Sequence, residues 1–232
     1  MKIEIYADGA NREDMLKRYK EGLVAGFTTN PSLMVKAGIK DYAGFAKAIL
    51  QEITDKSISF EVFSDEFPEM ERQALKISSY GKNVYVKIPI SNTKNESALP
   101  LCRRLLDQGL KLNITAILTE NQVRALHEMM KPTDDVIVSV FAGRIADTGV
   151  DPIPLMEKTV ALFKDKPGAK ILWASTREVL NIYQAEWAGC HIITVTDDLI
   201  SKLSLKGKNL EEYSLDTVKM FYNDAKKAGF DI

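Results

Sequence analysis

Short apolar segments of strand-forming residues recur along this chain, and each is separated from the next by a segment long enough for a helix. Eight such segments occur, at intervals of roughly 20 to 35 residues. They are 3–6, 24–27, 58–62, 84–88, 111–114, 136–140, 171–174 and 192–195. Since parallel strands need a long crossover between them, usually a helix, this alternation predicts eight consecutive β/α units.

The intervening segments carry apolar residues on one helical face. Segment 41–53 is an example, with apolar positions Tyr42, Phe45, Ala46, Ile49 and Leu50. Segment 152–163 has the same pattern. Eight β/α units in 232 residues predict an α/β fold, a closed (β/α)8 TIM barrel, with residues 1–232 as one domain. An open doubly wound sheet is the main alternative, but the chain has neither a Gly-x-Gly-x-x-Gly turn nor a Walker-type lysine loop.

A further amphipathic helix is predicted at 214–229, beyond the eighth unit. Its apolar residues at helical spacing are Leu215, Val218, Phe221, Tyr222 and Ala225. We expect this helix to pack on the outside of the barrel or on a neighbouring subunit.

The composition excludes several classes of protein. A formal net charge of -1 argues against a dedicated nucleic-acid binder, although it allows a local basic pocket for phosphate. The chain has no run of 18 apolar residues and no long apolar segment at its start, so we expect no membrane span and no signal peptide. Cys102 and Cys190 are too few and too far apart for a disulfide framework. We therefore expect a cytoplasmic protein.

The fourth predicted strand contains a lysine, Lys87, within the run 83–90. Its neighbours are mostly β-branched, and Pro89 is expected to end the pairing just after the lysine. An ammonium group that cannot reach water is costly, so the neutral amine becomes populated, and a neutral amine can form a Schiff base with a carbonyl substrate. The alternative is a lysine at a strand end whose amine reaches solvent. This segment alone does not decide between them.

Polar side chains occur at the carboxyl ends of seven consecutive predicted strands, where barrels of this kind carry their active sites. In chain order they are Asp8, Thr28, Asn30, Glu61, Lys87, Asn113, Thr115, Ser139, Arg144, Ser175 and Arg177. Their convergence on one mouth of the barrel predicts a functional site there.

Some of these residues also have a purely structural interpretation. Asp8 and Thr28 are suited to cap the helices that follow them, and Ser175 and Arg177 could cap or decorate the next helix. Glu61 lies between two apolar residues and needs a partner if it is buried.

Spacing and residue type favour function at the remaining positions. Asn113 and Thr115 are two residues apart and share one face of a strand, which favours a common target. Arg144, Ser175 and Arg177 supply two guanidinium groups and a hydroxyl, a set suited to a phosphate dianion.

The histidines and tryptophans point to no further site. His127 lies on a polar helix, and His191 adjoins Cys190, so these two neighbours face opposite sides of a strand and cannot hold one metal ion. We expect no metal site. Trp173 and Trp187 are interpreted as core or helix-packing residues.

The sequence resembles the transaldolase family, in particular its short-subunit branch, which includes fructose-6-phosphate aldolases. The resemblance extends from Tyr6 to about Thr196. It rests on the motifs Thr28-Thr29-Asn30-Pro31-Ser32, Val86-Lys87-Ile88-Pro89, Asn113-Ile114-Thr115, Phe141-Ala142-Gly143-Arg144-Ile145 and Ala174-Ser175-Thr176-Arg177. The family fold is a (β/α)8 barrel, in agreement with the strand pattern.

The resemblance implies a role for each site residue. It implies Lys87 as the Schiff-base lysine, Asp8 as the general acid-base, and Glu61 with Thr115 as the holders of a catalytic water. The substrate-binding residues that it implies are Asn30, Asn113 and Ser139 around the dihydroxyacetone unit, Arg144, Ser175 and Arg177 around the phosphate, and also Thr28 and Phe141.

The two activities of the branch differ at two positions. The aldolase, which releases free dihydroxyacetone, goes with glutamine at the Glu61 position and tyrosine at the Phe141 position. This chain has the transaldolase residue at both, and also at Asn113 and Ser139. One departure is Thr176, where an aromatic residue is common, so the phosphate side of the pocket is expected to differ in shape.

The predicted function is therefore that of a transaldolase. It would convert sedoheptulose 7-phosphate and glyceraldehyde 3-phosphate to erythrose 4-phosphate and fructose 6-phosphate. The alternatives are a fructose-6-phosphate aldolase and a non-catalytic barrel that binds phosphosugars. We expect no cofactor, no nucleic-acid or membrane partner, and a homo-oligomer, a pentamer or a decamer.

Overall fold

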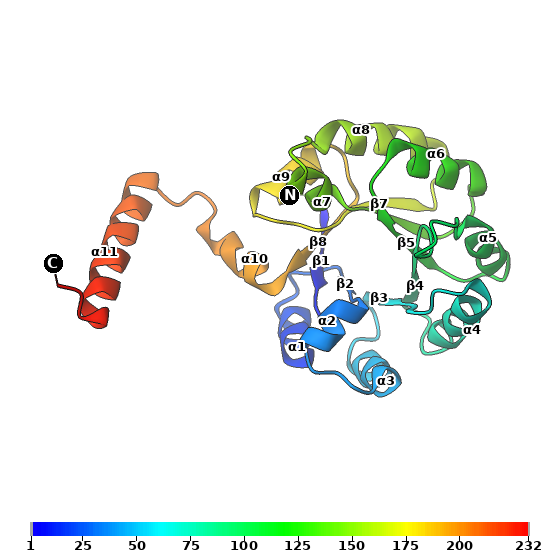
Figure 1. The fold of residues 1–232 in the computed structure, drawn as a ribbon, viewed down its shortest axis with the longest axis horizontal. Coiled ribbons are helices and arrows are strands. Elements are labelled where there is room, and N and C mark those ends of the chain that lie inside the picture. The colour runs from blue at the N-terminus through cyan, green and yellow to red at the C-terminus, as the bar shows by residue number, and fades with distance from the viewer. Residues whose placement is uncertain (1, 232) are drawn as a thin grey trace. The chain divides into compact units, whose positions relative to one another are not determined.

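Eight parallel strands close into a barrel in the computed structural model, which describes residues 2–231 (Figure 1). The strands follow one another around the barrel in chain order, and β8 pairs with β1 to close it. They are β1 (Glu4–Asp8), β2 (Gly26–Thr28), β3 (Ser57–Glu61), β4 (Val84–Pro89), β5 (Leu112–Ile117), β6 (Val136–Val140), β7 (Ala169–Trp173) and β8 (Ile192–Thr196). The predicted (β/α)8 barrel is confirmed.

Helices surround the strands, and Figure 1 shows α1, α3, α4, α5, α6, α8 and α9 in an outer ring. They are α1 (Arg12–Glu21), α2 (Pro31–Lys36), α3 (Tyr42–Glu52), α4 (Phe67–Ser78), α5 (Leu99–Asp107), α6 (Glu120–Met129), α7 (Ala142–Asp147), α8 (Ile153–Leu162) and α9 (Leu180–Trp187). The two helices predicted at 41–53 and 152–163 agree with α3 and α8 to within a residue at each end. A short 3-10 turn, η1 (Phe163–Asp165), follows α8.

The chain divides into two compact units, one ending at Ile200 and the other starting at Ser201. Helix α10 (Asp197–Lys202) contains the boundary, and η2 (Leu203–Leu205) and α11 (Leu210–Ala228) follow it. Helix α11 begins earlier than the predicted start at 214, because Asn209 caps it by accepting hydrogen bonds from the Glu211 and Glu212 amides. None of its side chains is buried. The single-domain organisation and the packing partner of α11 stay predictions.

The interior of the barrel changes character along its axis. Tyr6, Ile137, Leu172, Ala174 and Ile192 form a buried apolar cluster. Two residues after Tyr6, Ile137 and Ile192 along their strands, and on the same face, lie Asp8, Ser139 and Thr194. The core therefore fills the amino-terminal half of the barrel, and polar side chains face inward at the carboxyl-terminal mouth.

The capping alternatives for Asp8 and Thr28 are wrong. Asn11 caps α1 by accepting hydrogen bonds from the Glu13 and Asp14 amides, at 2.9 and 3.1 Å. Asn30 caps α2 by accepting a hydrogen bond from the Leu33 amide at 2.9 Å. Asp8 and Thr28 are thereby free of a capping role and face the interior.

Pro89 was expected from the sequence to end the pairing of β4. Instead, Pro89 itself pairs with Thr115 of β5. The Ile90 amide then donates to the Thr115 carbonyl at 2.9 Å, so the contact with β5 continues past the proline. The proline nitrogen faces β3, which has already ended at Glu61, so the missing N–H removes no bond.

The two tryptophans differ. Trp173 is a core residue, as predicted, with 1 % of its surface exposed. Trp187 is 69 % exposed, so its assignment to the core or to helix packing is wrong. It lies in the last turn of α9 and its ring lies 6.3 Å from that of Tyr183.

Candidate active site

A cavity of about 160 Å³ opens at the carboxyl-terminal mouth of the barrel. The predicted site residues that line it are Asp8, Thr28, Asn30, Lys87, Asn113, Thr115, Ser139, Phe141, Arg144, Ser175 and Arg177. Glu61 completes the predicted set through a direct contact with Lys87. The structure thus brings together side chains from seven strands or the turns that follow them.

Lys87 lies inside the barrel with only 6 % of its surface exposed. Its Nζ is 3.1 Å from the Glu61 carboxylate, and it donates a hydrogen bond to the Thr29 carbonyl at 3.3 Å. The alternative of an amine in open solvent is therefore wrong. The lysine is enclosed by polar partners as well as by hydrocarbon, and the Glu61 carboxylate contacts its amine directly.

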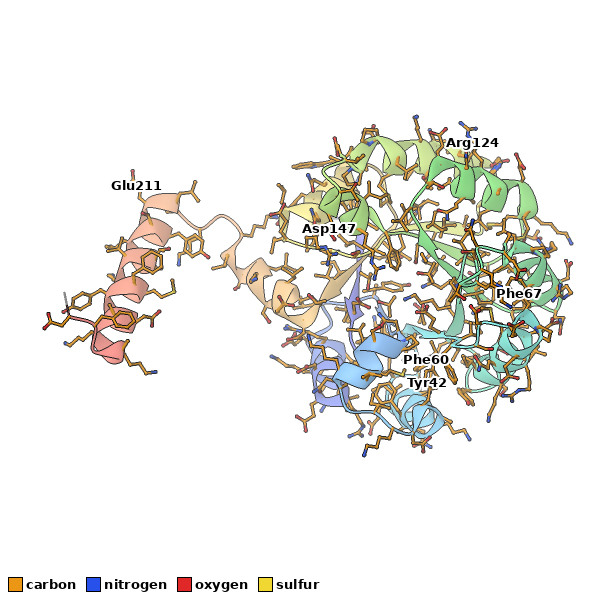
Figure 2. The ribbon with its side chains drawn as sticks, in the orientation of Figure 1. Tyr42, Phe60, Phe67, Arg124, Asp147 and Glu211 are labelled. Carbon is orange, nitrogen blue, oxygen red and sulfur yellow. The ribbon has the colours of Figure 1, made fainter. Side chains whose placement is uncertain are left out.

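Glu61 is held in register beside Lys87 because β3 and β4 pair at these two residues. Tyr42 of α3 supports the same strand end: its hydroxyl donates to the Glu61 carbonyl at 2.7 Å, and its ring packs edge-on against Phe60 at 6.3 Å (Figure 2). The partner that the sequence required for Glu61 is Lys87. The pair places a base next to the candidate nucleophile.

Asp8 at the end of β1 accepts a hydrogen bond of 2.7 Å from the Thr28 hydroxyl of β2. Burial raises the pKa of the Asp8 carboxyl, while the Lys87 charge and the Thr28 hydrogen bond oppose that rise. A carboxyl with a raised pKa holds its proton at a higher pH than an ordinary aspartate. It is therefore suited both to take up and to release a proton.

Asn113 and Ser139 belong to a buried chain of hydrogen bonds. The Ser139 hydroxyl donates to the Asn113 side-chain oxygen at 2.7 Å, and the Asn113 amide nitrogen donates to the Ser59 hydroxyl at 3.0 Å. This chain fixes the amide across β6, β5 and β3. Ser59 was missed in the sequence, although it lies two residues before Glu61 and therefore shares its face of the strand.

Thr115 lies at an irregularity in β5. The register with β6 shifts between Ile114 and Ile117, and Ala116 has a positive φ of 60°. Such bulges re-aim side chains next to active sites. The Thr115 hydroxyl is buried and has no hydrogen-bond partner within residues 2–231. It is free to bind a water or a substrate in the cavity.

The phosphate side is built from helix α7, which follows β6, and from the segment that follows β7. The Arg144 guanidinium lies over the Phe141 ring, 5.1 Å from its centre. Ser175 has a positive φ of 65°, and Gly143 packs so tightly against it that a Cβ at Gly143 would lie 1.5 Å from the Ser175 carbonyl oxygen. Only glycine permits this close approach.

Arg177 is already paired in the structure. Its guanidinium binds Asp147 of α7 with two nitrogens, the Nε–Oδ1 distance being 3.1 Å, and both side chains are about half exposed. Asp147 could not be found from the sequence, because an acidic residue at the end of a short helix is usually an ordinary surface residue. The capping alternative for Ser175 and Arg177 is wrong, since α9 starts after Val179 and has no side-chain cap.

Other titratable groups lie outside this site. His127 contacts Asp165 at 2.8 Å, and His191 accepts a hydrogen bond from the Ile171 amide. Within the described part of the chain, no group of three His, Cys, Asp or Glu side chains is placed to bind a metal ion. No helix among residues 2–231 is long and apolar enough to cross a membrane.

A closed (β/α)8 barrel with buried ionisable groups at the carboxyl ends of its strands belongs to the class of barrel enzymes. The family model described as Transaldolase/Fructose-6-phosphate aldolase matches residues 5–232. The chain therefore belongs to the transaldolase/fructose-6-phosphate aldolase family, as the sequence motifs predicted.

Curated relatives agree with this family assignment, and a solved structure shares the fold. The chain is 33 % identical to "Probable transaldolase 2" of Bacillus cereus, over 94 % of this chain and 98 % of the relative. It is 31 % identical to "Probable transaldolase" of Thermoanaerobacter sp., over 99 % and 100 %. A 3-hexulose-6-phosphate synthase from Salmonella typhimurium has a TM-score of 0.58 at 17 % identity, covering 84 % of this chain and 89 % of its own, which shows a shared fold.

Proposed function

We propose that this protein is a transaldolase that transfers a dihydroxyacetone unit from sedoheptulose 7-phosphate to glyceraldehyde 3-phosphate through a Schiff base on Lys87. The observation that carries the proposal is the buried Lys87–Glu61 pair, in a cavity that also contains Asp8. A buried lysine with an adjacent base can be activated as a nucleophile.

Formation of the Schiff base would begin with deprotonation of Lys87, for which Glu61 is the nearest base at 3.1 Å. The amine then attacks the C2 carbonyl of the ketose phosphate. A water held between Glu61 and the unpartnered Thr115 hydroxyl would relay protons as the carbinolamine loses water.

Cleavage and transfer would then depend on Asp8. It takes the proton of the C4 hydroxyl, the C3–C4 bond breaks, and the aldose phosphate leaves. The enamine on Lys87 attacks the second aldehyde while Asp8 returns the proton. The raised pKa of Asp8 supports this double role, because the group must be a base in one half-reaction and an acid in the other.

The decisive experiment is reduction with borohydride in the presence of fructose 6-phosphate, followed by mass spectrometry. The expected result is a stable mass addition of one dihydroxyacetone unit at Lys87, lost in Lys87→Met together with all turnover. Lys170→Met is the matched control, since Lys170 pairs with Glu4 at the other end of the barrel. Trapping at another lysine, or turnover by Lys87→Met, would refute the proposal.

The alternative within the family is a fructose-6-phosphate aldolase that releases free dihydroxyacetone. Phe141 favours transfer, because a phenyl ring has no hydroxyl with which to protonate the enamine. Incubation with sedoheptulose 7-phosphate, with and without glyceraldehyde 3-phosphate, separates the two: a transaldolase gives products only with the acceptor. A non-catalytic barrel would give neither products nor trapping.

We also propose that the protein is a cytoplasmic homo-oligomer, a pentamer or a decamer. Large apolar side chains on α11, among them Val218, Phe221 and Tyr222, are more than half exposed, and a neighbouring subunit could cover them. Cys102 and Cys190 are buried free thiols, in keeping with a reducing compartment. Sedimentation velocity on the whole chain measures the number of subunits.

A further inference from the structure

The last strand of the barrel contributes a hydroxyl to the acid-base side of the cavity. Thr28 contacts two groups: its hydroxyl donates to Asp8 at 2.7 Å and also lies within hydrogen-bond distance of the Thr194 hydroxyl on β8. Thr28 and Thr194 are both buried, and both line the cavity. The three side chains form a continuous chain from β8 through β2 to β1.

The donors and acceptors in these hydrogen bonds follow from the number of hydrogens that each side chain can donate. A threonine hydroxyl has one hydrogen to donate, whereas an ionised carboxylate can only accept. When Asp8 is ionised, the Thr28 hydrogen is used by Asp8, so the bond between the two threonines must be donated by Thr194. Thr194 thus fixes the rotation of the Thr28 hydroxyl toward Asp8.

We propose that Thr194 is a positioning residue for Asp8: by donating to the Thr28 hydroxyl it directs that hydroxyl to the Asp8 carboxylate and stabilises its ionised form. This inference rests on the proposed function only for the catalytic role of Asp8.

Thr194 is itself held firmly. Its backbone pairs with Tyr6 of β1, and its carbonyl accepts a hydrogen bond of 2.7 Å from the Thr176 hydroxyl. Thr176 is the position at which the sequence departs from the family. The threonine at this position stabilises β8 by its hydrogen bond to the Thr194 carbonyl.

Ionisation of Asp8 strengthens these hydrogen bonds. A carboxylate oxygen is a stronger acceptor than the carbonyl oxygen of a carboxylic acid, so the bond from the Thr28 hydroxyl is stronger when Asp8 is ionised. A hydrogen bond donated by Thr194 polarises the Thr28 hydroxyl and strengthens it further as a donor. The two hydrogen bonds therefore oppose the rise in the Asp8 pKa that burial causes.

Other charges also border Asp8, and the test leaves them unchanged. The charged residues that line the active-site cavity with Asp8 are Lys87, Arg144 and Arg177. Glu61 forms an ion pair with Lys87. Those lining a second cavity on the outer side of Asp8 are Asp14, Arg18, Lys36, Asp197 and Asp198. Replacement of Thr194 by valine removes a hydroxyl and no charge.

The test is a titration of the Asp8 carboxyl by NMR in protein labelled with ¹³C at aspartate carboxyl groups, with Asp8→Asn assigning the signal. In Thr194→Val the midpoint should move upward by at least about 0.3 pH unit, because the ionised form loses support. The acid limb of the kcat/KM profile should move in the same direction. A midpoint shift below about 0.1 unit would overturn the proposal.

Three variants keep this test interpretable. Thr194→Ser retains the hydroxyl and should restore the wild-type midpoint. Thr159→Val removes another buried threonine hydroxyl, which donates to the Leu155 carbonyl on α8, and should leave the midpoint unchanged. If Thr194→Val does not fold, Thr194→Ala is measured in its place. An equal shift in the Thr159 variant would contradict a specific role for Thr194.

The readout separates this inference from the proposed function. A shifted midpoint in a protein that shows no borohydride trapping would reject the transaldolase and leave the positioning role standing. Trapping and turnover with no shift of the midpoint would reject Thr194 and leave the transaldolase standing.

Discussion

The two sides of the active-site cavity are built differently. On the acid-base side, Asp8, Thr28 and Thr194 belong to strands, and Thr28 forms a buried hydrogen bond with Thr194 and a partly buried one with Asp8. On the phosphate side, Arg144 and Arg177 lie beyond the strand ends, and Arg177 pairs with Asp147 while both remain about half exposed. Buried polar contacts are costly to break, whereas exposed ion pairs contribute little. The first side should therefore respond steeply to substitution and the second gradually.

The largest effect is expected at Asp8. Asp8→Asn removes the proton acceptor for the C4 hydroxyl, so the rate of carbon–carbon cleavage should fall by about 10²- to 10⁴-fold. Borohydride trapping at Lys87 should persist, because the lysine and Glu61 remain in place. Single-turnover cleavage measured beside trapping yield checks both parts. Cleavage at the wild-type rate would leave Asp8 without a catalytic role and remove the contrast between the two sides.

An intermediate effect is expected at the arginines. Arg144→Leu should raise KM for a ketose phosphate by about 10- to 100-fold, which corresponds to the loss of a charged hydrogen bond. With unphosphorylated ketoses the same variant should differ little from wild type, since no phosphate is bound. Steady-state kinetics with both donors measures the difference.

The matched control for Arg144→Leu is Arg124→Leu, which removes an exposed arginine paired with Glu120 on α6. It should leave both donors unaffected. An equal loss with phosphorylated and unphosphorylated donors would show that Arg144 supports the structure of the pocket and does not recognise phosphate.

The smallest effect is expected at Asp147. Its carboxylate occupies the Arg177 guanidinium that the phosphate is proposed to bind, so Asp147→Asn should lower KM for phosphorylated donors by about 2- to 5-fold at low salt. The gain should shrink as ionic strength rises. Kinetics at two salt concentrations test this, with Glu120→Gln as a control at another surface carboxylate that pairs with an arginine. A higher KM in Asp147→Asn would mean that Asp147 orients Arg177 rather than competing for it.

The barrel and most of the cavity lining were predictable from the sequence for a physical reason. Strand patterning places Asp8 and Thr28 at strand ends, and a closed parallel barrel brings all such ends to one mouth. The family motifs named the same positions.

What the sequence did not reveal depends on contacts between distant segments. Thr194 and Ser59 are ordinary strand residues until the closed barrel turns them toward Thr28 and Asn113. The bulge at Ala116 has no residue signature, since alanine rarely takes a positive φ.

The pairing of β8 with β1 has a consequence for synthesis on the ribosome. The carboxyl group that handles the proton is among the first residues made, and the threonine proposed to hold it belongs to the last strand. A nascent chain that has emerged only as far as β7 therefore contains both Lys87 and Glu61. It lacks β8, the strand that pairs with β1 beside Asp8. Carbon–carbon bond cleavage should be acquired late, when the two ends of the barrel meet, so prematurely terminated chains should be inert toward sugar phosphates.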